Sequence, residues 1–275
     1  RVAVIHELAR GVGPGGRRGG GFMPSSLRLC PLGSGTANTR VGGSLSGFGV
    51  RAGAHAVVLD LGAGALARLL DEADPAELDA LVITHAHPDH CIDLFALHVY
   101  LAHGPGRQEP LPLFTPPGLA GRFSAFGGVD HWDEVFATSE LPPPAGRLQI
   151  RPELTLAWQE VPHLPPTFAL RLEHGAGSIC FGADCGPNDE LGSFARDVDV
   201  LILECSFGTG PVPGGVPHLD AAGVVDIARA ARPGRLLLTH CYPEHDRRAT
   251  LTAVSDALDC PVAWAEEGER VEFGD

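Results

Sequence analysis

The sequence predicts a mixed α/β fold for this chain of 275 residues, and three observations support the prediction. Short runs rich in Val, Ile, Leu and Phe recur along the chain between Gly, Pro and Asp residues, a pattern typical of buried strands. Stretches with helical spacing of apolar residues lie between some of these runs. Segments rich in Gly and Pro indicate loops, because proline lacks an amide donor and glycine permits unusual backbone angles.

The apolar runs are each short enough to form one strand of a sheet. In chain order, the predicted strands cover residues 26–33, 55–62, 78–85, 154–163, 167–175, 177–184, 198–206, 234–241 and 260–268. Helical spacing predicts helices over residues 64–70, 91–101, 219–231 and 246–258. Loops are expected over residues 103–118, 140–147 and 208–218. Strands flanked by helices in this way are typical of α/β proteins.

Residues 1–22 differ in composition from the rest, being rich in Gly and Arg, and they precede Met23. We interpret them as a tag, a linker or a non-native leader, and we expect one domain over residues 23–275. The leader lacks the apolar core and cleavage site of a signal peptide. Seven cysteines without a C-x-x-C pair fit a reducing compartment, so the expected location is the cytoplasm. An apolar run of about 18 residues, as a membrane span requires, is missing.

The charge of the chain bears on its partners. The formal net charge is -14, and every strong cation is an arginine because the chain contains no lysine. Nucleic-acid-binding proteins usually carry a basic patch. A large polyanionic partner is therefore doubtful, and a small-molecule substrate is expected.

The densest cluster of candidate metal ligands directly follows an apolar run. The motif H-x-H-x-D-H comprises His85, His87, Asp89 and His90. Neutral imidazoles and carboxylates are the donors that zinc and similar divalent ions accept. Pro88 separates the first two donors from the last two, so one loop can serve two ions. A solvated histidine-rich loop is the alternative, but four donors within six positions argue against it.

Further candidate residues close other apolar runs: His163, Asp184, Glu204 and His240. Functional side chains commonly lie on loops that a rigid scaffold positions, and strand ends can converge at one rim of a sheet. Taken singly, each residue has another explanation. Asp184 could be a turn residue, and His240 could be a buried core histidine.

Together with their surroundings, these residues resemble the metallo-β-lactamase superfamily over nearly the whole chain after Met23. The segments LGSGTANTR, LDLGAG, VPHLPPTFALRLE, FGADCGP, LILECSF and LTHCYPEHD are similar to successive motifs of its ribonuclease Z-like branch. The resemblance implies an αββα sandwich of two mixed β-sheets flanked by helices. It also implies two divalent metal ions per chain at one edge, with zinc foremost and manganese or iron as alternatives, and a homodimer.

The resemblance also implies individual roles. It assigns His85, His87 and His163 to one ion, Asp89, His90 and His240 to the other, and Asp184 to both. The candidate catalytic residues are Asp89, Glu204 and His218. Glu204 would orient His218, and a histidine held by a carboxylate could donate a proton to the leaving oxygen. The alternative for His218 is a place in the N-cap region of the helix at residues 219–231.

Cysteines directly follow several of these candidates: Cys91, Cys185, Cys205 and Cys241. Thiolates bind zinc well. However, adjacent side chains of a strand point to opposite faces, and the ligand set is complete without sulfur. We therefore expect these cysteines to pack as small hydrophobic residues.

The Glu204 and His218 pair favours a metal-dependent phosphodiesterase that acts on a small phosphodiester, such as a cyclic nucleotide or nucleotide diester. Ribonuclease Z activity on tRNA is one alternative, but the 20 residues between His163 and Asp184 suffice only for a two-strand hairpin and not for the basic arm of that enzyme. A thioesterase or lactonase on the same metal core is another. A flavodiiron module would carry Glu at the position of His87, and a noncatalytic relative would have lost donors.

Overall fold

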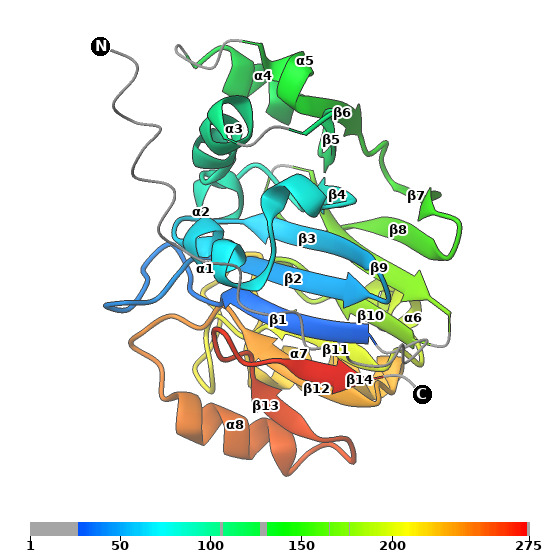
Figure 1. Ribbon diagram of the computed structural model, residues 1–275. Coiled ribbons are helices and arrows are strands. Elements are labelled where there is room, and N and C mark those ends of the chain that lie inside the picture. Colours follow the sequence, from blue (N-terminus) through cyan, green and yellow to red (C-terminus); the bar gives the residue numbers. More distant parts are fainter. Residues whose placement is uncertain (1–26, 105–106, 127–130, 165, 176, 274–275) are drawn as a thin grey trace.

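The computed structural model describes residues 27–273 except 105–106, 127–130, 165 and 176. Two mixed sheets pack face to face, and helices cover their outer sides (Figure 1). The predicted αββα sandwich is therefore confirmed. The predicted boundary between a leader and the domain, at residues 22–23, lies outside the described residues.

The first sheet has an antiparallel half and a parallel half. Its strands, from one edge to the other, are β14 (Val271–Phe273), β1 (Leu27–Gly33), β2 (Gly47–Ala52), β3 (His55–Leu61), β4 (Ala80–Val82), β5 (Leu111–Thr115) and β6 (Phe136–Glu140). Neighbours from β14 to β3 run antiparallel, and neighbours from β3 to β6 run parallel.

The second sheet repeats this division. Its strands, from one edge to the other, are β13 (Val262–Trp264), β12 (Arg235–Thr239), β11 (Val200–Glu204), β10 (Gly177–Phe181), β9 (Thr167–His174), β8 (Leu154–Val161) and β7 (Ala145–Arg151). Neighbours from β7 to β10 run antiparallel, and neighbours from β10 to β13 run parallel. The carboxyl ends of β8, β10, β11 and β12 therefore share one edge, where the candidate site lies.

Helices close the two outer layers of the sandwich. The first sheet is covered by α1 (Ala65–Glu72), α2 (Pro88–Cys91), α3 (Leu94–His103), α4 (Leu119–Ser124) and α5 (Trp132–Val135), with a 3-10 turn at Pro75–Glu77. The second sheet is covered by α6 (Asp189–Phe194), α7 (Ala221–Ala231) and α8 (Arg247–Ser255). Among the described residues, no helix is long and apolar enough to cross a membrane.

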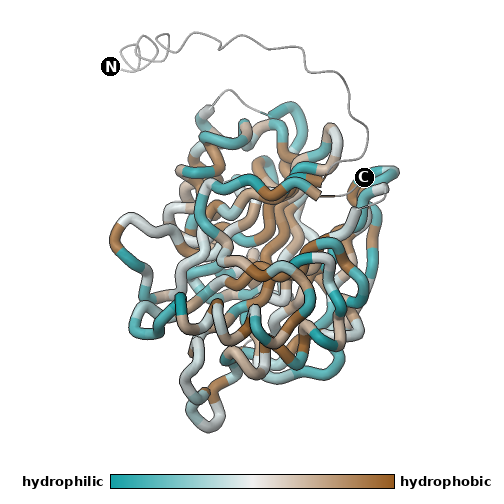
Figure 2. Tube along the Cα trace, turned by 90° about the horizontal axis from the view of Figure 1, so that it is seen from below, coloured by the Kyte–Doolittle hydropathy of each residue, from teal (hydrophilic) through white to brown (hydrophobic). Residues whose placement is uncertain are grey.

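One apolar core lies between the two sheets. Successive side chains of a strand point to opposite faces, so Val57 and Leu59 of β3 pack between the sheets whereas Ala56 and Val58 pack under the helices. A strand buried on both faces reads as a continuous apolar run, which is why β3 was recognisable in the sequence. Hydrophobic residues accordingly gather inside the fold, and hydrophilic residues lie mainly outside (Figure 2).

Several predicted elements differ from the structure, including the loop predicted over 140–147, which contains the start of β7. The strand predicted over residues 78–85 is limited to Ala80–Val82, and the residues after it leave the sheet. The helix predicted over 91–101 is interrupted between α2 and α3, where the Asp93 carboxylate accepts a hydrogen bond from the Leu66 backbone at 3.0 Å. The predicted loop at 103–118 contains β5, whose prolines concealed an alternating burial pattern.

Candidate metal centre

A buried carboxylate organises the loop that carries the H-x-H-x-D-H motif. Asp60 lies at the end of β3 with a left-handed backbone, φ 58°. Its carboxylate accepts hydrogen bonds from the Thr84 backbone amide at 2.8 Å and from His90 Nδ1 at 2.6 Å. With Nδ1 engaged as a donor, His90 presents Nε2 to the site, as a carboxylate partner does for a ligating histidine. Asp60 was missing from the predicted site, although it lies within the LDLGAG segment.

Three histidines form the first donor group. His87 Nδ1 lies 3.1 Å from His85 Nε2 and 3.2 Å from His163 Nε2. His163 Nδ1 donates to the Pro217 carbonyl at 3.1 Å, which leaves His163 Nε2 as an acceptor. Burial lowers the pKa of all three imidazoles below the usual value. They are therefore neutral near pH 7, the form that binds metal ions.

The second donor group surrounds Asp184. It comprises Asp89, His90, Asp184 and His240, whose donor atoms lie within 4.8 Å of one another. One Asp184 carboxylate oxygen lies 3.3 Å from His90 Nε2, and the other lies 3.4 Å from His240 Nε2 and 4.0 Å from His163 Nε2. The structure thus places Asp184 between the two groups, where a bridging ligand would lie. Although burial opposes ionisation, His240 and His90 hold the pKa of Asp184 well below its usual value.

The donor set fits divalent cations. His90 Nε2 is buried and faces the Asp184 and Asp89 carboxylates at 3.3 and 3.8 Å, but it makes no well-formed hydrogen bond within the part of the chain that the structure describes, an arrangement that is costly in a folded protein unless something else occupies the position. Burial opposes a charged His90 ring, but the Asp184 and Asp60 carboxylates outweigh it and raise the pKa of His90. Two clusters of imidazole and carboxylate donors therefore point at positions where a cation would replace a proton.

Backbone turns aim two strand ends into the site. Ala183, which precedes Asp184, has φ 56°, and His240 has φ 53°. Left-handed backbone is uncommon for residues with a Cβ and persists where the surrounding structure holds it. The His240 amide donates to the Ser34 carbonyl at 3.0 Å, and His240 Nδ1 lies 3.0 Å from Ser206 Oγ. These contacts direct His240 Nε2 toward Asp184.

Glu204 and His218 adjoin this donor set. His218 Nδ1 lies 2.7 Å from Glu204 Oε1, and the His218 ring centre is 4.9 Å from that of His163. Burial opposes a charged His218 ring, but the hydrogen bond and charge of Glu204 outweigh burial, so the pKa of His218 is raised above its usual value. The N-cap of α7 is Asp220, whose carboxylate accepts from the Gly223 amide at 2.9 Å. His218 therefore lies two residues before the N-cap of α7 and does not itself cap the helix.

Glu204 itself is fully buried and holds several donors. Its oxygens accept from the Cys185 amide at 2.8 Å, the Leu219 amide at 3.2 Å and Ser206 Oγ at 2.5 Å. Ser206 is a second residue absent from the predicted site. It follows Glu204 by two positions, and no local pattern in the sequence distinguishes this serine from an ordinary turn residue.

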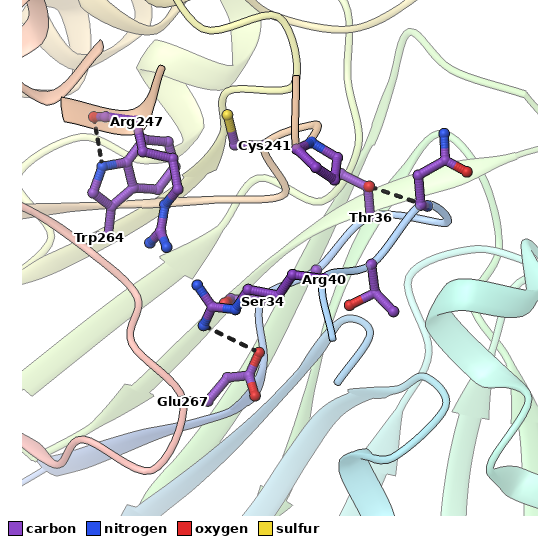
Figure 3. A pocket seen from close by; sticks show the side chains of 11 residues that line it. Ser34, Thr36, Arg40, Cys241, Arg247, Trp264 and Glu267 are labelled. Carbon is purple, nitrogen blue, oxygen red and sulfur yellow. Dashed lines mark hydrogen bonds and ion pairs between the residues drawn. The ribbon is translucent and has the colours of Figure 1, made fainter. Parts of the chain in front are cut away.

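Most of the neighbouring cysteines pack as predicted. Cys91 belongs to the core under α3, and Cys185 and Cys205 belong to the core under α7. Burial raises the pKa of the Cys91 thiol to about 12 and also holds the pKa of Cys185 well above its usual value. Cys241 differs, because it is half-buried and lines a pocket (Figure 3). All seven cysteines of the chain are free thiols.

Cys241, which follows His240, lines this pocket together with Ser34 and Thr36 of the loop after β1 (Figure 3). Arg40 approaches Glu267 at 3.7 Å on one side. On the other side, Arg247 pairs with Glu266 at 2.7 Å and lies over the Trp264 ring at 4.4 Å. The ion pairs thus connect the loop after β1 and the start of α8 to the segment that follows β13.

Comparison with known proteins places the chain in a family. The model of the β-lactamase superfamily domain matches residues 55–241. An uncharacterised protein of Mycobacterium tuberculosis is 32% identical over 251 residues, which is 86% of this chain and 89% of that protein. A ribonuclease Z of Mycobacterium bovis is 31% identical over 170 residues, 56% of this chain and 61% of the enzyme.

A Bacillus subtilis protein is similar in both sequence and structure. The probable metallo-hydrolase YhfI is 27% identical over 199 residues, covering 71% of this chain and 79% of YhfI. The crystal structure of YhfI superposes with a TM-score of 0.82 at 21% identity, covering 90% of this chain and 100% of YhfI. The chain therefore belongs to the β-lactamase superfamily, as a metallo-β-lactamase-fold hydrolase related to ribonuclease Z.

Proposed function

We propose that this protein is a binuclear zinc phosphodiesterase that hydrolyses a small phosphodiester, such as a cyclic nucleotide or a nucleotide diester. The 2.7 Å contact between Glu204 and His218 carries the proposal. Many hydrolytic reactions can use the surrounding donor set. A histidine that a buried carboxylate keeps protonated beside that set suits a reaction whose leaving group is a poorly stabilised alkoxide.

His85, His87 and His163 would hold one zinc ion, and Asp89, His90 and His240 would hold the other, with Asp184 shared. Nitrogen and oxygen donors of this kind suit zinc, although manganese and iron accept them too. Two such ions would neutralise phosphoryl charge and make hydroxide available near neutral pH.

The protein's own residues would handle the leaving group. Protonated His218 donates Nδ1–H to Glu204, so its remaining proton is on Nε2. That proton is the one available to the leaving oxygen. Ser206 and the Cys185 amide hold Glu204 in place, which keeps the His218 ring oriented through the reaction. The donor atom of His218 also comes within 4.8 Å of those of His163 and Asp184, so a role as a metal ligand competes with the role as an acid.

Several features support a small substrate. Most of the 20 residues between His163 and Asp184 are taken up by the antiparallel pair β9 and β10, which leaves little chain for a protruding arm. The net charge of -14 also disfavours a long polyanion. Ribonuclease Z activity on precursor tRNA is the second candidate, and the similarity to the Mycobacterium bovis enzyme favours it.

Hydrolysis assays distinguish these functions. Zinc-loaded protein would be tested against bis(p-nitrophenyl) phosphate, cyclic AMP, a precursor tRNA, an acyl thioester and an acyl lactone. We expect turnover of the first two and little of the others. Accurate tRNA cleavage at physiological salt would establish the ribonuclease Z function instead. Rapid thioester or lactone turnover without diester turnover would identify an acyl hydrolase.

The proposal also covers the cellular location and the oligomeric state of the protein. We propose a cytoplasmic location, which the free state of all seven cysteines supports. We also propose a homodimer, as the family resemblance implies. Sedimentation equilibrium of the zinc-loaded protein would measure its mass, and a monomer at micromolar concentration would contradict the dimer.

A further inference from the structure

An aromatic cluster of Phe207, Tyr242 and His245 lies beside the candidate acid. The Tyr242 ring centre is 6.3 Å from that of His218 and 6.4 Å from that of His240. Phe207 lies 5.5 Å from Tyr242 and 6.3 Å from His218. The proposed reaction uses none of these three rings, although they border the atoms at which it would occur.

Tyr242 is half-buried, and its described aromatic neighbours meet its ring at steep angles. Its described ring neighbours meet it at interplanar angles of 68° for Phe207, 75° for His218 and 59° for His240. Among the described residues, therefore, no ring stacks in parallel on Tyr242. The side chain is only half-buried, so part of its aromatic surface remains available to a planar ligand.

Backbone hydrogen bonds and a contact with Phe207 position the segment that carries this ring. After the left-handed turn at His240, the Tyr242 amide donates to the Ser206 carbonyl at 3.1 Å, and its carbonyl accepts from the His245 amide at 3.1 Å. Phe207 contacts the Tyr242 ring from the side, and the His245 ring in turn lies 5.7 Å from Phe207. A tyrosine fixed in this way loses little conformational entropy when a ligand stacks on it.

From this placement we propose that Tyr242, supported by Phe207, is a stacking platform for the base of a nucleotide whose phosphate lies at the metal centre. The inference rests on the proposed phosphodiesterase function and narrows its substrates to those that carry a nucleobase. An aromatic face accepts any base through its π-surface, so the platform selects nucleotides over other phosphodiesters without selecting a particular base. Tyr242 is thus a specificity residue and not a catalytic one.

Binding of two matched probes tests the platform without turnover. Adenosine 5′-monophosphate and ribose 5-phosphate share the phosphate and the sugar and differ in the base. Isothermal titration of the zinc-loaded protein with each probe gives the affinity ratio that the base contributes. Stacking on one aromatic side chain is expected to favour the nucleotide roughly 5- to 150-fold. The Tyr242→Ala variant should bring the ratio close to one, and Tyr242→Phe should keep it.

Matched controls separate stacking from damage to the site. Tyr242→Ala should keep its zinc content and its affinity for ribose 5-phosphate, whereas loss of both would be a structural effect. In that event Phe207→Leu, which removes the supporting ring alone, should still reduce the ratio. Tyr100→Ala, on α3 at the opposite outer layer, should leave the ratio unchanged.

The outcomes discriminate between the inference and the proposed function. A wild-type ratio near one, or a ratio that survives both Tyr242→Ala and Phe207→Leu, overturns the platform. If diesters are hydrolysed but neither probe binds at millimolar concentration, the platform fails and the phosphodiesterase function stands. If no diester is hydrolysed yet the nucleotide preference depends on Tyr242, the platform stands and the proposed reaction fails.

Discussion

Replacing His218 by alanine should slow hydrolysis in a way that depends on the leaving group. The side chain is nearly buried, and it forms an ion pair with Glu204 at 2.7 Å. Removing the imidazole leaves the same Glu204 oxygen bonded to the Cys185 amide at 2.8 Å, so the buried carboxylate keeps a donor. The fold and the proposed ligand set should therefore survive the change.

The size of the effect follows from the role of the proton. General acid catalysis contributes about 10²- to 10⁴-fold, or roughly 3–5 kcal/mol at about 1.36 kcal/mol per tenfold change in rate. We expect that loss for a diester with an alkoxide leaving group. A p-nitrophenolate departs without a proton, so the loss should shrink to a few-fold for an aryl diester.

Glu204 should be tested with glutamine, because alanine would remove the acceptor of several neighbouring donors. Glu204→Gln keeps an acceptor for His218 but removes the negative charge that holds its proton. A charge-assisted hydrogen bond exceeds a neutral one by about 1 kcal/mol, which corresponds to a loss of roughly fivefold with an alkoxide leaving group. Because the two residues act as a unit, the double variant should be no slower than His218→Ala alone.

The assay is a plot of log kcat/KM against leaving-group pKa for the wild type, His218→Ala and an exposed-histidine control, His103→Ala. Bound zinc is measured on the same samples. A steeper dependence for His218→Ala at unchanged zinc supports the acid role. An equal loss for good and poor leaving groups, or loss of a zinc ion, would refute it and make His218 a ligand.

The remaining predictions concern the metal centre and the stability of the fold. Reconstituted protein should contain two zinc equivalents by mass spectrometry of the metal, and a firm single equivalent under saturating zinc would contradict the binuclear proposal. Asp184→Ala should abolish turnover with an unchanged circular dichroism spectrum, because a core of this size does not need metal to fold; substantial residual turnover would exclude a bridging role. Asp60→Asn should weaken zinc binding about 10- to 100-fold in chelator competition, because Asp60 orients His90, and an unchanged affinity would refute that link. Burial opposes ionisation of Asp79, but the Ala56 amide and Arg151 outweigh it and lower the pKa of Asp79 in the folded state. The carboxylate therefore stabilises the fold above its unfolded pKa, about 3.9, and loses this contribution as the pH falls through the lower folded value. Asp79→Asn should cost about 1–3 kcal/mol in urea unfolding at pH 7, and the cost should decline below about pH 4; a cost independent of pH would show that charge is not involved.

Residues with a local signature could be predicted from the sequence. Four donors within six positions marked the loop after β4, and the apolar runs ending at His163, Asp184, Glu204 and His240 indicated strand ends. The structure brings all of these side chains together at one edge of the sandwich. They could be recognised because a buried strand shows as a run of consecutive apolar residues. The resemblance to the ribonuclease Z-like branch then indicated which donors from distant segments share a metal ion.

Other elements had no local signal. The prolines within and around β5 make its sequence resemble a loop. In the structure, however, the residues of β5 alternate between buried and half-buried positions. At the break between α2 and α3, the Asp93 carboxylate accepts a hydrogen bond from the Leu66 amide. That partner lies 27 positions away, and no helical pattern within residues 91–101 reveals it.

The sequence by itself therefore determined the fold class, the donor motif and the order of the strand ends, because periodicity and composition are properties of neighbouring residues. Only the tertiary structure decided which groups orient the donors. Asp60 reaches His90 across 30 positions, Ser206 reaches His240 across 34, and Tyr242 meets Phe207 through the packing of two separate loops. Hydrogen bonds and ring contacts act over a few ångströms, so such partners are set by where the chain folds back on itself and not by spacing along it.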